Sequence, residues 1–204
     1  MRNYIYKEDL PKDLNLGTVI AIDTETMGLN PHRDRLCLMQ ISSGNGDCHL
    51  VQFGIENGYT SPNLKALLSN KKVLKIFHFA RFDVATIHKY LGVECKPIYC
   101  TKIASKLART YTDRHGYKDL CKDLLNIEIS KQQQSSDWGA KTLLKEQLEY
   151  AAIDVLHLHA LRKLLNEQLI REGRMELANA CFSFIPYRCQ LDLNGWEEPD
   201  IFSH

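Results

Sequence analysis

The sequence predicts an α/β protein, with helices flanking a mixed β-sheet, in a single domain. Short apolar runs rich in β-branched residues alternate with stretches of helical periodicity, which is the pattern of α/β layers. Two hairpin connections follow one early strand, so part of the sheet should be antiparallel. The length of 204 residues suits one domain with a sizeable core.

Each expected element has its own signal in the sequence. Gly28 and Pro31 break the chain after the first strand, and Asn45-Gly46 marks a hairpin turn. Ser61-Pro62 supplies a capping residue and a first-turn proline for a helix. The expected strands are residues 19–22, 36–42, 48–53, 72–77 and 96–100. The expected helices are residues 63–69, 84–91, 101–109, 116–125 and one long helix over about 142–169.

The last part of the chain is apolar in a way that predicts packing. Leu144, Leu148 and Val155 belong to the stripe that the long helix should bury. Residues 177–204 carry more apolar surface than a disordered tail does. We therefore expect residues 171–204 to pack on the body of the domain or on another subunit.

Composition and charge exclude several classes of protein. No segment approaches the roughly 20 apolar residues of a membrane span, and the first residues are too polar for a signal peptide. Seven scattered cysteines without a CxxC pair favour reduced thiols, and thus a cytoplasmic protein. A net charge of +1 without a basic stripe argues against a grip on long nucleic acid.

Carboxylates are concentrated at three places in the predicted fold. Asp23 and Glu25 end the first strand on the same side, where they repel each other unless a cation lies between them. Asp83 follows a strand, and Tyr150 and Asp154 share one helix face. Taken separately, these are also compatible with solvated carboxylates and a core tyrosine. Together, four carboxylates suit two divalent ions, Mg²⁺ or Mn²⁺.

The same residues resemble the motifs of a known superfamily. Asp23-Thr24-Glu25, the segment 78–83 and the segment 150–154 are similar to the three motifs of the DEDD 3′-5′ exonucleases, and Tyr150 places the chain in the tyrosine branch. Ser136-Asp137-Trp138 extends the resemblance to ribonuclease D, over about residues 15–170. The chain is too short for the helical domains that follow the nuclease in ribonuclease D. It closely resembles the small nanoRNase C type.

The resemblance implies a fold, a reaction and an assembly. The fold would be ribonuclease H-like, with residues 1–204 forming one exonuclease domain. Asp23 would bridge two metal ions, Glu25 and Asp154 would complete the first metal site, Asp83 would support the second, and Tyr150 would hold the attacking water. The substrate would be very short RNA such as dinucleotides, cleaved to nucleoside 5′-monophosphates. The family forms ring-like homo-octamers.

Expected substrate contacts surround these motifs. By its position in the motif, Leu29 resembles the leucine that oligoribonuclease wedges between two bases; the alternative is a turn leucine packed inward. For the other expected contacts the alternatives are a strand-end histidine at His78, a structural arginine at Arg81, a packed side chain at Phe82 and a core residue at Trp138. His157 and His159 are expected to be structural. The full set of expected contacts is Thr24, Met27, Gly28, Leu29, His78, Arg81, Phe82 and Trp138.

Two other functions remain compatible with the sequence. One is ribonuclease D-like processing of longer RNA or DNA, and the other is a nuclease fold that only binds nucleic acid. The intact carboxylates count against the second, and the lack of a basic stripe counts against the first. Nucleophilic catalysis by serine has no support, because no G-x-S-x-G segment occurs.

Overall fold

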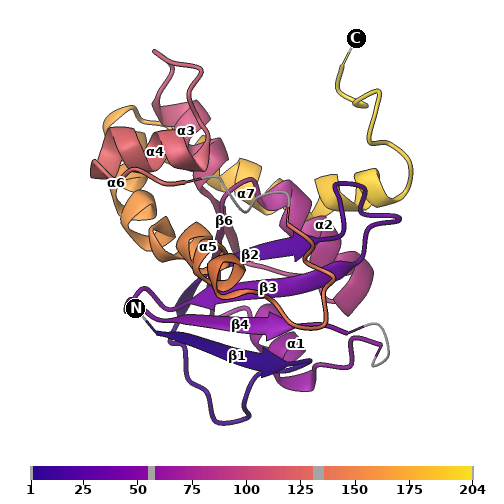
Figure 1. Cartoon of the computed structure of the whole chain (residues 1–204). Helices are drawn as coiled ribbons and strands as arrows, with labels where there is room; N and C mark the ends of the chain where they lie inside the picture. The colour runs from indigo at the N-terminus through magenta and orange to yellow at the C-terminus, as the bar shows by residue number, and fades with distance from the viewer. Residues whose placement is uncertain (1, 55–57, 131–135, 204) are drawn as a thin grey trace.

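A six-stranded mixed sheet forms the centre of the computed structural model, which describes residues 2–54, 58–130 and 136–203. The strand order is β1-β4-β3-β2-β5-β6 (Figure 1). The strands are β1 (Asn3–Lys7), β2 (Val19–Thr26), β3 (Leu36–Ser42), β4 (Cys48–Gln52), β5 (Leu74–Phe77) and β6 (Ile98–Cys100). The predicted α/β class with a mixed sheet is confirmed.

Strand β2 lies in the interior of the sheet and connects its two halves. It pairs antiparallel with β3 and parallel with β5, and β3 in turn pairs antiparallel with β4. The predicted antiparallel flank is therefore correct. Strand β1 was not predicted; it is an edge strand parallel to β4, and its mostly exposed side chains give it no apolar pattern.

Helices cover both faces of this sheet (Figure 1). Helix α5 packs on β2, β3 and β4, and α2 packs on the opposite face. The helices are α1 (Pro62–Ser69), α2 (Ala80–Leu91), α3 (Thr101–Ala108), α4 (Tyr117–Leu125), α5 (Lys145–Leu156), α6 (Leu158–Arg171) and α7 (Met175–Leu193). None of the described helices has both the length and the apolar character needed to cross a membrane.

The long helix expected over residues 142–169 is wrong, because the chain divides it into α5 and α6 at His157. In a continuous helix, the His157 N–H would donate to the carbonyl of Ile153. The Tyr117 hydroxyl donates to that carbonyl instead, at 2.6 Å. The expected burial of Leu144 is also wrong: it precedes the first turn of α5, and 64% of it is exposed.

The C-terminal helix α7 packs on α2, α3 and β6. Phe182, Ile185 and Cys189 are buried in this contact. Asp192 binds the Arg81 guanidinium of α2 through two hydrogen bonds of 2.7 and 2.8 Å, which ties the end of α7 to the start of α2. Asp192 also pairs with Arg188 at 3.2 Å.

Replacing Asp192 with alanine should lower the free energy of unfolding by about 1–2 kcal/mol, because Arg81 loses its carboxylate and Arg188 keeps only the more distant Asp200, at 3.7 Å. The contribution of the Arg81 ion pair to this loss should be small, because the Arg81 side chain is 37% exposed and solvent weakens the pair. Urea unfolding followed by circular dichroism measures the change. Gln190→Ala, at an exposed position of the same helix, is the control and should leave stability nearly unchanged; equal effects of the two substitutions would contradict the bracing role.

Candidate active site

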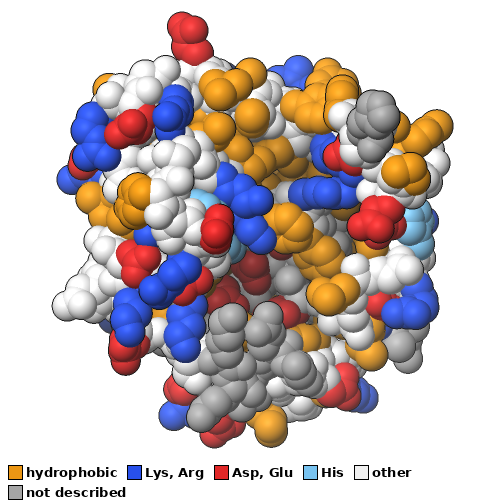
Figure 2. All heavy atoms as spheres, turned by 90° about the horizontal axis from the view of Figure 1, so that it is seen from above, with side chains coloured by type: hydrophobic (Ala, Val, Ile, Leu, Met, Phe, Trp, Pro, Cys, Tyr) orange, Lys and Arg blue, Asp and Glu red, His pale blue; other side chains and the backbone are white. Residues whose placement is uncertain are grey.

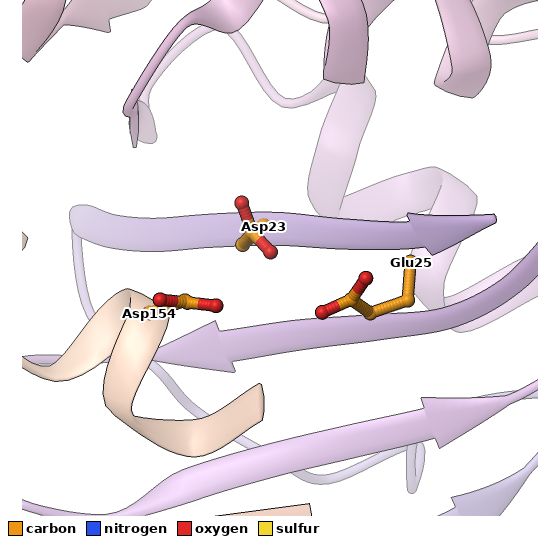
Figure 3. A group of neighbouring side chains, drawn as sticks. All are labelled: Asp23, Glu25 and Asp154. Carbon is orange, nitrogen blue, oxygen red and sulfur yellow. The ribbon is translucent and has the colours of Figure 1, made fainter. Parts of the chain in front are cut away.

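Three carboxylates from two elements meet at one point of the sheet (Figure 3). Asp23 and Glu25 come from β2, and Asp154 comes from α5. Side chains alternate along a strand, so residues 23 and 25 both point to the face that α5 covers. One oxygen from each of the three lies within 4.8 Å of the others. The structure therefore brings these predicted residues together.

The fourth predicted carboxylate, Asp83, lies beside this group in the first turn of α2. It is 2% exposed, and its Oδ1 accepts a hydrogen bond of 2.7 Å from the Thr24 hydroxyl. Thr24 lies between Asp23 and Glu25 and therefore points to the opposite face, toward α2. The observed role of Thr24 is to hold Asp83, and its expected substrate contact remains a prediction.

Burial raises the pKa values of all four carboxyl groups, and repulsion from neighbouring carboxylates adds to it for Asp23, Glu25 and Asp83. Desolvation, then the charges of Asp83, Asp154 and Glu25, hold the pKa of Asp23 well above its usual range. Desolvation, then the charges of Asp154 and Asp83, raise the pKa of Glu25 to about 9. Desolvation raises the pKa of Asp83 to about 7, against the opposing hydrogen bond from Thr24, and that of Asp154 also to about 7.

This donor set fits divalent metal ions. Within the described residues, no lysine or arginine forms an ion pair with any of the four carboxylates. Carboxylate oxygens are the ligands that Mg²⁺ and Mn²⁺ prefer. A cation bound among them would remove the repulsion that raises their pKa values.

Tyr150 lies one helical turn before Asp154 and shares its face of α5. A hydrogen bond from its hydroxyl lowers the pKa of Asp154, while burial raises the pKa of Tyr150 itself. The buried Trp138 ring lies 6.2 Å from the Tyr150 ring, measured between centroids. The core alternative for Trp138 therefore agrees with the structure, and the residue braces Tyr150.

Two of the four carboxylates, Asp23 and Asp154, line a recess of about 230 Å³. Figure 2 shows acidic side chains at its floor and basic side chains nearby at the surface. His78 lines it, accepting or donating a 2.9 Å hydrogen bond with Thr101, and burial lowers its pKa to about 3, so its ring is neutral. Tyr117, Lys118 and Ile129 also line the recess, and the sequence did not predict them there. None of the three belongs to a recognised motif. The one signal in the sequence was Tyr117, an aromatic residue at the start of a predicted helix.

The turn after β2 presents Leu29 to solvent. Leu29 is 85% exposed and Met27 is 53% exposed, so the alternative of an inward-packed leucine is wrong. Asp34 fixes the turn by accepting a hydrogen bond of 2.9 Å from the Asn30 N–H. A Cβ at position 28 would lie 2.3 Å from an Asp34 oxygen, which explains the glycine there.

Two other expected contacts have structural partners. The Arg81 guanidinium is held by Asp192, as its structural alternative anticipates. Phe82 is partly buried in the same helix. His159 shares a 3.2 Å hydrogen bond with the Ser42 carbonyl, in agreement with a structural role.

Comparisons with known proteins agree with this geometry. A family model described as 3′-5′ exonuclease matches residues 3–170. Ribonuclease D of Gluconacetobacter diazotrophicus is 34% identical over 157 residues, which are 77% of this chain; the chain spans only 39% of that relative. The structure of Brucella melitensis NrnC with bound Mg²⁺ is 51% identical, with a TM-score of 0.95 and full coverage of both chains. Brucella melitensis NrnC bound to pGG is 52% identical, with a TM-score of 0.96, and covers 100% of this chain and 99% of that one.

The raised pKa of Glu25 predicts how stability changes with pH when divalent ions are removed. The folded protein keeps a proton on Glu25 up to about pH 9, whereas the unfolded chain loses it above 4.5. The folded state thus binds more protons, and its stability falls as pH rises. In EDTA, Glu25→Gln should gain on the order of 3 kcal/mol relative to wild type between about pH 6 and pH 8.5.

Urea unfolding of the wild type and the variant over this pH range measures the difference in their free energies of unfolding. The contributions of the other titrating groups are nearly the same in both proteins and largely cancel in this difference. Added Mg²⁺ or Mn²⁺ should stabilise the wild type more than the variant. Stability curves that stay parallel across the pH range would contradict the prediction.

Proposed function

The chain belongs to the 3′-5′ exonuclease family, and from this we propose that it is a metal-dependent exoribonuclease that degrades very short RNA, such as dinucleotides, to nucleoside 5′-monophosphates. The observation that carries the proposal is the cluster of Asp23, Glu25 and Asp154, with Asp83 beside it. A metal-dependent nuclease needs such a cluster to hold cations against a phosphodiester. In a module that only binds nucleic acid, the mutual repulsion of the buried carboxylates would be a cost without a function.

Each carboxylate has a place in this proposal. Asp23, Glu25 and Asp154 would hold one divalent ion, and Asp23 with Asp83 would hold a second. Two bound ions, Mg²⁺ or Mn²⁺, supply charge neutralisation at the phosphate and acidify the attacking water. The Mg²⁺ bound by Brucella melitensis NrnC supports at least one such ion.

Tyr150 positions the water in the proposed reaction. Its hydroxyl stays protonated, because burial and nearby carboxylates raise its pKa. A neutral hydroxyl both donates to Asp154 and accepts from a water on its other side. His78, neutral at physiological pH and lining the same recess, can accept or donate a hydrogen bond to the substrate without adding charge.

Two features favour a short substrate. The recess holds about 230 Å³, and the exposed Leu29 presents an apolar side chain that a base can stack on. Brucella melitensis NrnC, which this chain matches from end to end, binds pGG. The curated ribonuclease D relatives are longer than twice the matched segment.

We also propose a homo-oligomer, a ring-like octamer by resemblance, located in the cytoplasm. The C-terminal segment exposes aromatic side chains that a second copy could cover: Phe184, Trp196 and Phe202. The cysteines are all free thiols, which supports a reducing compartment.

Asp154→Asn should fold and lose divalent-dependent cleavage by on the order of 10³-fold, because one ligand of the cluster is neutral. Tyr150→Phe should lose about 10²-fold, because the water loses its orienting partner. Release of nucleoside monophosphate from a labelled dinucleotide measures both. Glu149→Gln, on the same helix and paired only with Lys145 among the described residues, is the control. Full activity of Asp154→Asn would refute the mechanism.

A substrate-length series tests the preference for short RNA. We expect kcat/KM for a dinucleotide to exceed that for an RNA of about ten nucleotides, and Leu29→Ala to lower the dinucleotide value about ten-fold through lost stacking. Leu177→Ala, an exposed leucine on α7, should have no such effect. If the longer RNA is cleaved as well as the dinucleotide, ribonuclease D-like processing replaces the proposal.

A further inference from the structure

A second and larger cavity lies at the edge of the sheet opposite the carboxylates. It holds about 750 Å³ and lies between α6, α7 and the segments that enter β5 and β6. Because β2, β5 and β6 are parallel, their starts and their ends lie at opposite edges. The carboxylates belong to the end of β2, whereas Leu74 and Ile98, which line this cavity, begin β5 and β6. The two sites have no lining residue in common.

Polar atoms that line this cavity lack hydrogen-bond partners in the described parts of the chain. They are the Tyr99 hydroxyl, the Arg162 Nε and the Asn166 Oδ1. Tyr99 is only 4% exposed, so bulk water does not satisfy its hydroxyl. A buried polar group without a partner is costly. Three of them along one cavity indicate a place built for a polar ligand.

Aromatic packing fixes the position of these groups. The Tyr99 ring packs against Phe182 with 4.6 Å between centroids. The Arg162 guanidinium lies over the same Tyr99 ring, 5.6 Å from its centre. Tyr187, 57% exposed, offers a further ring at the cavity wall. The cavity thus combines a preformed cationic group with aromatic surface.

The charges around the cavity favour an anion. Lys71 and Arg162 form no ion pair with a carboxylate of the described residues, and Lys96 is paired with Glu94 at 2.6 Å. The remaining wall is apolar and includes Pro97 and Met175. An anionic group near Arg162, with a planar ring against the apolar and aromatic wall, would use both properties.

We propose that this cavity binds a nucleoside 5′-monophosphate. Its phosphate pairs with Arg162, and its base supplies the N–H donor that the Asn166 oxygen needs and the ring that the aromatic wall accepts. The volume suits a ligand of this size, since small-molecule sites range over about 300–1,000 Å³. This site is separate from the carboxylate cluster and requires neither a metal ion nor the proposed hydrolysis.

Binding of GMP in EDTA tests the proposal, by isothermal titration calorimetry on the intact protein. GMP has no phosphodiester bond to hydrolyse, and without metal the carboxylate cluster repels its phosphate. Arg162→Gln should weaken binding at least about ten-fold, as expected for a charge-assisted contact. Tyr99→Phe, which removes a single oxygen, should weaken it about five-fold.

Lys163→Gln is the matched control, since it makes the same change of charge at the neighbouring exposed position of α6, and it should bind GMP like the wild type. Guanosine and inorganic phosphate should each bind more weakly than GMP. Binding of GMP that is unaffected by both Arg162→Gln and Tyr99→Phe would place it elsewhere and overturn the proposal. Absence of GMP binding, with an altered oligomeric mass for Arg162→Gln in light scattering, would instead assign the cavity to a second copy of the chain. Either result leaves the exonuclease proposal standing.

Discussion

Electrostatic repulsion among four carboxylates is the constraint on which the rest of the structure depends. Three of them lie within 4.8 Å of one another, and burial removes the water that would screen their charges. A chain that folds around such a group needs a rigid frame to keep the carboxylates from separating. The frame is the β2 strand, buried in the interior of the sheet between β3 and β5, with α5 on one face and α2 on the other.

The same frame links the site to distant parts of the chain. The Tyr117 hydroxyl of α4 donates a hydrogen bond to the Ile153 carbonyl. This contact ends α5 directly after the turn that carries Asp154. Thr24 joins β2 to Asp83 on α2, and Arg81, two residues earlier, joins α2 to Asp192 at the end of α7. The α7 helix, which no motif includes, therefore supports the position of the fourth carboxylate.

The sequence predicted the parts of this protein that local pattern determines. Strand β2 and its carboxylates follow from an apolar run that ends in Asp23 and Glu25, and the shared face of Tyr150 and Asp154 follows from helical spacing. Strand β1 and the break at His157 were not predictable in this way. The first has the exposed side chains of an edge strand, and the second results from a hydrogen bond between residues that are 36 positions apart. Residues that line the recess from α4, such as Tyr117 and Lys118, depend on the same tertiary contact.

The turn that presents Leu29 has a thermodynamic consequence. The Asp34 carboxylate accepts a hydrogen bond from the Asn30 N–H and lies close against Gly28. Both contacts restrict the conformations of the turn. Ordering a flexible backbone costs roughly 1–2 kcal/mol per residue, and binding must otherwise overcome this entropy. Here folding has already restricted these residues. A ligand that stacked on Leu29, as proposed, would therefore retain nearly all of the stacking free energy, and a single exposed leucine would be an effective anchor for a molecule too small to form many contacts.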